Sequence, residues 1–173
     1  MTLWTIMLAI PTWSILGSLL WHIRGGLFGN LLHELIPFWG TTISRLSYSA
    51  IILLPLLLMH AWYIYIACWA LLYIGTIFSW SNWQYMVTPS SDILSMSFRG
   101  ALLTVPAGVV ADSALLALCG LTLGPCYYVG MHYMPLGWTD LDKGIVTDGT
   151  PNCEYLFGLI LGAAIICSVI FGV

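Results

Sequence analysis

The run from Ser47 to Phe78, SYSAIILLPLLLMHAWYIYIACWALLYIGTIF, decides the fold. It contains no Asp, Glu, Lys or Arg over more than thirty residues. A helix that crosses a bilayer needs about 20 apolar residues, so the run is too long for one crossing. We therefore predict two membrane helices with a tight turn near His60. A single long, tilted helix is the alternative.

The composition of the whole chain places it in the same class. The 173 residues are 60% hydrophobic and only 6% charged, with a mean hydropathy of +0.96. Soluble domains carry about 25% charged residues. We therefore expect an all-α, polytopic integral membrane bundle formed by one domain, residues 1–173. Four Lys and Arg residues are too few for the clustered basic face of a nucleic-acid-binding protein, so we expect no nucleic-acid partner.

The apolar run from residue 93 to residue 134 is also too long for one helix, and we divide it near residues 111–113. Pro11 lies inside the first span, and Gly124-Pro125 are expected to kink the fifth. The predicted spans are residues 3–22, 42–59, 61–80, 93–110, 113–134 and 154–172.

Ile23–Gly40 is too polar and too rich in glycine to span a bilayer. Within it, residues 27–36 have a helical pattern that ends at Pro37, which predicts a short interfacial or re-entrant helix. Asn30, His33 and Glu34 share one edge of that helix at positions i, i+3 and i+4. The edge is therefore a candidate polar face.

The basic residues predict the orientation. With six spans, Arg24, Arg45, Arg99 and Lys143 all fall on one side of the membrane, and the turns near residues 60 and 112 carry no Lys or Arg. Cytoplasmic loops are enriched in Lys and Arg. We therefore expect a multi-pass protein with cytoplasmic charged loops and both termini on the outer side.

Three arginines and a glycine pair form the candidate ligand site. Arg24 adjoins Gly25 and Gly26, whose backbone allows close approach, and guanidinium groups bind phosphate or carboxylate bidentately. We predict that these residues, with Arg45 and Arg99, bind an anion. The alternatives are a structural charge lock with Glu34 or Asp92, and side chains that extend to the lipid headgroups.

Catalytic chemistry has a weaker basis in the sequence. If the protein is an enzyme, His22 and Glu34 are the candidates for a general base. No pair of His, Cys or acidic residues has the spacing of a metal site, so we expect no metal and no cofactor. The five cysteines include no C-x-x-C pair, and we interpret them as small core residues.

Two further features concern helix ends and helix packing. We expect Asp112 to cap the helix after the second turn; a buried acid that handles protons or ions is the alternative. The small-residue motifs at Gly120 and Gly124, and at Gly158 and Gly162, favour close helix contacts. We expect them to pack the fifth and sixth helices together or to form a homo-oligomer seam.

These observations favour a small membrane protein that is not an enzyme: a pore, a carrier or a pore-forming oligomer with a polar site on the cytoplasmic face. A lipid-modifying enzyme that binds a phosphate head group is one alternative, and an accessory subunit of a larger membrane complex is another. The expected partners are membrane lipids and further copies or other subunits. A pore requires a polar path through the bundle or along an oligomer axis, and a dry centre lined only by Leu, Ile and Phe would contradict it.

Overall fold

The computed structural model describes residues 2–23, 40–77, 93–132 and 150–173, and within these ranges it is all-helical, without strands. The all-α prediction is therefore confirmed. The elements are α1 (Leu3–Ile23), α3 (Gly40–Leu53), the 3₁₀ helix η1 (Leu54–Leu58), α4 (Trp62–Ile77), α6 (Ile93–Val110), α7 (Ala114–Cys119), the 3₁₀ helix η3 (Gly120–Thr122), α8 (Leu123–His132) and α9 (Thr150–Phe171).

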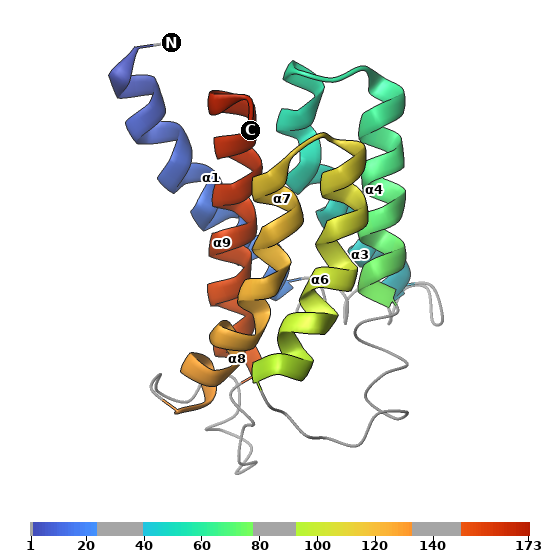
Figure 1. Ribbon diagram of the computed structural model, residues 1–173, viewed down its shortest axis with the longest axis vertical. Helices are drawn as coiled ribbons and strands as arrows, with labels where there is room; N and C mark the ends of the chain where they lie inside the picture. The colour runs from blue at the N-terminus through green and yellow to red at the C-terminus, as the bar shows by residue number, and fades with distance from the viewer. Residues whose placement is uncertain (1, 24–39, 78–92, 133–149) are drawn as a thin grey trace.

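The helices run up and down a single bundle (Figure 1). The turns at residues 59–61 and 111–113 lie at one end, together with Thr2 and Val173, and we call this the turn end. At the opposite end, which we call the loop end, α1, α4 and α8 finish and α3, α6 and α9 begin. The predicted interfacial or re-entrant helix at residues 27–36 lies outside the described residues.

The break near His60 is confirmed, and the single long helix is excluded. Pro55 has no N–H to donate, and α3 passes at this point into the five-residue η1. The N–H groups of Met59 and His60 then both bond the Leu56 carbonyl, at 3.1 and 2.8 Å. The chain turns there, and α4 begins at Trp62.

The second break also lies where the length of the run predicts it, but the predicted cap is wrong. Ser113, not Asp112, is the N-cap of α7: its backbone is extended and its hydroxyl accepts from the Leu116 N–H at 3.1 Å. Asp112 occupies the left-handed region, with φ of +49°, and its side chain is exposed. The alternative of a buried acid is therefore wrong as well.

The fifth helical run is irregular before Gly124-Pro125 rather than at that pair. The 3₁₀ helix η3 separates α7 from α8 at residues 120–122. Pro125 cannot donate to the carbonyl of Leu121, four residues earlier, which loosens the helix there. The Thr104 hydroxyl enters this gap: it accepts from the Gly120 N–H at 3.0 Å and donates to the Ala117 carbonyl at 3.0 Å.

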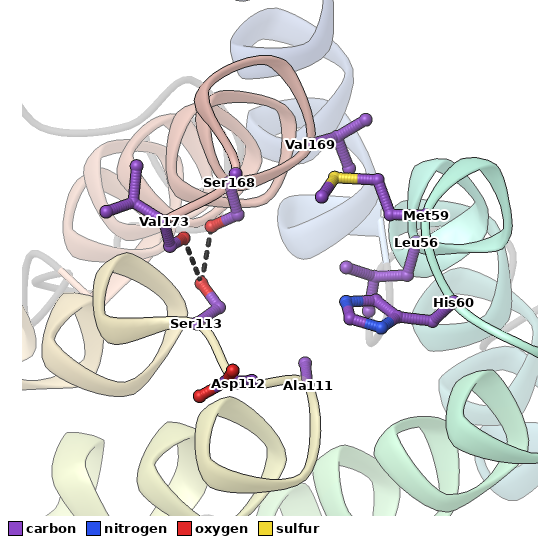
Figure 2. Close-up of a pocket in the computed structure, with 10 residues that line it drawn as sticks. Leu56, Met59, His60, Ala111, Asp112, Ser113, Ser168, Val169 and Val173 are labelled. Carbon is purple, nitrogen blue, oxygen red and sulfur yellow. Dashed lines mark hydrogen bonds between the residues drawn. The ribbon is translucent and has the colours of Figure 1, made fainter.

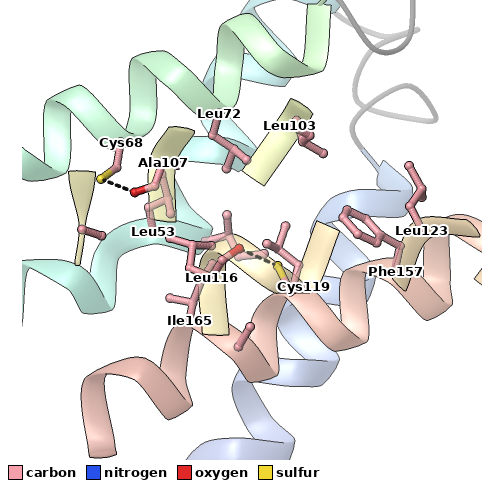
Figure 3. Packing of buried hydrophobic residues seen from close by; sticks show 14 of the residues in the cluster. Leu53, Cys68, Leu72, Leu103, Ala107, Leu116, Cys119, Leu123, Phe157 and Ile165 are labelled. Carbon is pink, nitrogen blue, oxygen red and sulfur yellow. Dashed lines mark hydrogen bonds between the residues drawn. The ribbon is translucent and has the colours of Figure 1, made fainter. Parts of the chain in front are cut away.

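The bundle has a close-packed apolar core (Figure 3). Leu53, Leu72, Leu116, Phe157 and Ile165 are at most 1% exposed and come from four different helices. The thiols of Cys68, Cys119 and Cys126 are buried and free, and two of them donate to backbone carbonyls. These three cysteines are therefore core residues, as the sequence suggests, whereas Cys167 is half-buried.

The four motif glycines lie at helix contacts, but their partners differ from those expected. A Cβ on Gly162 would lie 2.3 Å from the Trp13 carbonyl oxygen of α1, and Gly17 of α1 would meet the Gly158 oxygen at 2.4 Å. Gly120 and Gly124 face α6: a Cβ added to either would lie 2.0 Å from a carbonyl oxygen, that of Gly100 or Ile93 respectively. These glycines therefore join α9 to α1 and α8 to α6 within one copy, not the fifth helix to the sixth.

Close approach of α1 and α9 also permits hydrogen bonds between them. The hydroxyls of Ser14 and Ser18 donate to the α9 carbonyls of Leu159 and Tyr155, at 2.7 and 3.0 Å. Together with the glycine contacts, these bonds fix the register of α1 on α9 without any charged group.

Candidate functional site

The backbone brings several candidate residues to the loop end. His22 lies in the last turn of α1, Arg45 in the second turn of α3 and Arg99 in the second turn of α6. Because the helices alternate in direction, these positions share one end although they lie up to 77 residues apart. Among these three, only the side chain of Arg99 belongs to the described part of the structure.

Most of the predicted ligand site lies outside the described residues. This applies to the anion-binding candidates Arg24, Gly25 and Gly26 and to the polar edge formed by Asn30, His33 and Glu34. Their roles stay predictions. The same holds for the catalytic pair His22 and Glu34, since neither side chain is described.

Arg99 is a half-buried cation without an acidic partner in the described structure. Its Nε is buried and has no hydrogen-bond acceptor, and Nη1 contacts only the Met96 sulfur at 3.8 Å. Among the acidic residues of the chain, Asp112 is the one whose side chain is described, and it lies at the turn end. Charges at membrane depth usually pair with one another or mark a functional site, so Arg99 is the central described residue of the candidate site.

The pattern of α6 explains the position of Arg99. Met96, Gly100 and Leu103 are buried in the core, and Arg99 lies at the margin of this stripe. A helical Cα–Cβ bond points toward the helix N-terminus, so the side chain starts toward the loop end. Six residues separate Arg99 from Ile93, a rise of about 9 Å. A long side chain covers most of that distance.

A pocket at the turn end is the second polar region (Figure 2). Its volume is about 110 Å³, and it opens between the two turns and the end of α9. His60 enters it from the turn before α4, and Asp112 and Ser113 from the turn before α7. Sequence reasoning gave no role to His60 beyond marking a break.

The serines of this pocket form a clasp between α7 and α9. The Ser113 and Ser168 hydroxyls are 2.5 Å apart, and Ser113 also bonds the backbone oxygen of Val173 at 3.0 Å. Each hydroxyl has one hydrogen to donate: Ser168 donates either to Ser113 or to the Ala164 carbonyl at 2.7 Å, and Ser113 donates either to Ser168 or to Val173. In the sequence, this contact is represented only by two isolated serines, Ser113 before α7 and Ser168 near the end of α9. Isolated serines in apolar sequence are too common to single out.

The pocket holds Ser, His and Asp side chains, but they do not form a catalytic triad. The Ser113 hydroxyl is engaged by the Leu116 N–H, Ser168 and Val173. In the described structure no hydrogen bond joins it to His60 or joins His60 to Asp112. A nucleophile needs a base within hydrogen-bond reach, so the arrangement serves packing instead.

Metal binding and comparison with known proteins add no further assignment. The described residues include no group of three or more His, Cys, Asp or Glu side chains that could hold a metal ion. No protein-family model, no curated protein and no solved structure matches the chain. The functional argument therefore depends on the bundle and on Arg99.

Proposed function

We propose that the protein is a six-span integral membrane protein that works without covalent catalysis, as a pore-forming oligomer or carrier whose path runs between copies. The observation that supports this proposal is a bundle whose described residues are largely apolar both on the outer surface and in the centre. The polar site belongs to the loop end, on the cytoplasmic side.

The outer surface supports the membrane placement. Side chains such as Trp4, Leu58, Leu94 and Val109 are 71–79% exposed, and they come from α1, η1 and α6. Two helices, at Leu3–Leu20 and Ile93–Val110, are long and apolar enough to cross a bilayer, and four shorter apolar helices accompany them. Burial in lipid stabilises such surface by about 25 cal/mol per Å², whereas water would leave it uncovered.

The interior supports a path between copies rather than through one. The buried hydroxyls of Ser18, Ser49 and Thr104 bond backbone carbonyls, so they offer no row of free polar groups. The remaining centre of the described bundle is Leu, Ile, Phe, Met, Ala and Cys, with the single tyrosine Tyr48. An ion or a polar solute needs a lining of hydrogen-bonding groups, which this centre does not provide.

The orientation is supported by the two described basic positions. Arg45 and Arg99 both lie near the loop end, and the described turn end carries no Lys or Arg. Positive residues are retained on the cytoplasmic side. We therefore propose a cytoplasmic loop end and an outer turn end.

Reconstitution at several protein-to-lipid ratios tests the proposal. If the path forms between copies, solute flux per proteoliposome rises more steeply than linearly with protein density. Native mass spectrometry should then detect oligomers in the same preparation. Flux that is linear in density from a monomeric protein would place the path within one copy, and the absence of both flux and oligomers would contradict the proposal.

A lipid-modifying enzyme is the second candidate, and the unpaired Arg99 is the observation that favours it. In that case Arg99 holds a phosphate head group while His22 or Glu34 acts as the base. His22→Gln and Glu34→Gln would then abolish turnover of a labelled phospholipid without changing oligomer formation. An accessory subunit is the third candidate, and it predicts that a native complex contains other chains in fixed ratio.

A further inference from the structure

We propose that Arg99 binds the phosphate of an anionic membrane lipid at the loop end of α6. The proposal rests on the membrane placement proposed above and names a lipid as the partner of this residue. The observation is a half-buried guanidinium with a buried Nε–H that lacks an acceptor, on a helix whose other exposed side chains nearby are apolar.

The polar contacts of Arg99 are incomplete. A guanidinium carries five N–H donors and keeps its charge in proteins. The described contacts of this one amount to a single weak acceptor, the Met96 sulfur at 3.8 Å. A charged N–H group that is buried without an acceptor raises the free energy of the folded protein. An anion whose oxygen accepts from this Nε–H would therefore be bound strongly.

The surroundings of Arg99 determine which anion fits. Leu102, one turn after Arg99 on the same face of α6, is 47% exposed, and Leu94 and Phe98 on other faces of the helix are 78% and 56% exposed, so the exposed surface of this part of α6 is apolar. Free phosphate gains nothing from that surface, whereas acyl chains cover it. The side chain starts toward the loop end, where the headgroups of the proposed membrane lie. A lipid phosphate therefore satisfies the charge and the apolar surface together.

An acid from the same chain is the competing partner. Asp92, seven residues before Arg99 in the sequence, lies outside the described residues. If it pairs with Arg99, the two residues form a charge lock and no lipid is needed. The experiment must therefore separate a lipid contact from an internal ion pair.

The test uses the full-length protein in mild detergent, with native mass spectrometry to count bound lipids. The probes are phosphatidylglycerol, phosphatidylcholine and inorganic phosphate. We expect phosphatidylglycerol to bind in preference to phosphatidylcholine. The Arg99→Gln substitution should lower the affinity for phosphatidylglycerol by about tenfold or more. Arg99→Lys should recover only part of the affinity, because an ammonium group lacks the planar fork. Lys143→Gln removes the same charge elsewhere and should leave the affinity unchanged.

Each contrary result overturns the proposal. If wild type and Arg99→Gln bind phosphatidylglycerol with equal affinity, Arg99 is not the site. If Arg99→Gln and Lys143→Gln lose the same affinity, the lipid responds only to the net charge of the protein. Binding of inorganic phosphate with the same affinity as the lipid shows a free-anion site. If Arg99→Gln fails to fold but folds again when combined with Asp92→Asn, Arg99 is locked to Asp92. Failure of the membrane placement is visible separately, since the protein would then stay soluble without detergent.

Discussion

Replacement of Gly100 by alanine tests the packing of α6 against the irregular α7–α8 run. A Cβ at Gly100 would lie 1.8 Å from the Gly120 carbonyl oxygen and 2.7 Å from the Leu123 Cβ. An ordinary C···O contact is about 3.3 Å, so the backbones must separate by roughly 1.5 Å. Overpacking of this kind costs about 1–3 kcal/mol.

Gly75→Ala is the matched control. Its Cβ would lie 3.1 Å from Leu103, which requires a shift of only a few tenths of an ångström. Both substitutions gain the same helix propensity, about 1 kcal/mol, so the difference between the two variants isolates the packing cost. At 2–4 °C per kcal/mol, we expect the Tm of Gly100→Ala to lie roughly 2–12 °C below that of Gly75→Ala.

The buried thiols supply the assay. Cys68, Cys119 and Cys126 are free and covered in the folded bundle, so a thiol-reactive dye labels them as the protein unfolds. The same thiols are present in both variants, which makes the two melting curves directly comparable. A Gly100→Ala protein that melts at or above the temperature of Gly75→Ala would refute the close approach of α6 and η3.

Three further substitutions test the turns and the buried hydroxyl with the same melting assay. Ser113→Ala should cost about 1–2 kcal/mol because the cap of α7 and the bond to Ser168 are both lost, whereas Ser113→Thr keeps the cap; equal stability of the two would refute the clasp. Thr104→Val should cost about 1–3 kcal/mol because the buried Gly120 N–H loses its acceptor, and Thr104→Ser should cost less; the reverse order would contradict the bridging role. Asp112→Val should cost roughly 1–2 kcal/mol because a β-branched residue is strained at positive φ, whereas Asp112→Asn should be nearly neutral; a stable valine variant would show a different turn.

Run length predicted the helical breaks well, because length is a physical limit that the sequence displays directly. The turns near His60 and at residues 111–113 follow from apolar runs that exceed one crossing. The residue that caps the helix after the second turn was harder to predict from the sequence. Asp112 and Ser113 are both good cap residues, and the choice depends on which one adopts the extended backbone.

Packing partners could not be derived from the motifs alone. A small-residue motif predicts that a backbone approaches closely, but it does not name the helix that approaches. The α1 residues opposite Gly162 include Trp13, which no small-residue pattern would single out. The bridging role of Thr104 could not be predicted for a similar reason. A single threonine in an apolar span indicates no contact until the structure shows the irregular helix that lies opposite it.

Neither the sequence nor the described structure alone defines the whole candidate site. The sequence assigned Arg99 to an anion site or a charge lock, and the structure shows a half-buried guanidinium with an unaccepted Nε–H. The polar edge at Asn30, His33 and Glu34 stays a prediction. A charged residue within apolar sequence thus indicated the position of a candidate site. The binding partner of Arg99 depends on three-dimensional contacts, which the spacing of residues in the sequence does not reveal.

Membrane topology is the most direct test of the six-span account. In a cysteine-free background, Ala61→Cys reports the turn end and Thr147→Cys reports the loop between α8 and α9. With a membrane-impermeant maleimide on intact cells, we predict labelling of Ala61→Cys from outside, and of Thr147→Cys only after the membrane is permeabilised. Labelling of both positions from the same side, or recovery of the protein in the soluble fraction, would contradict the account.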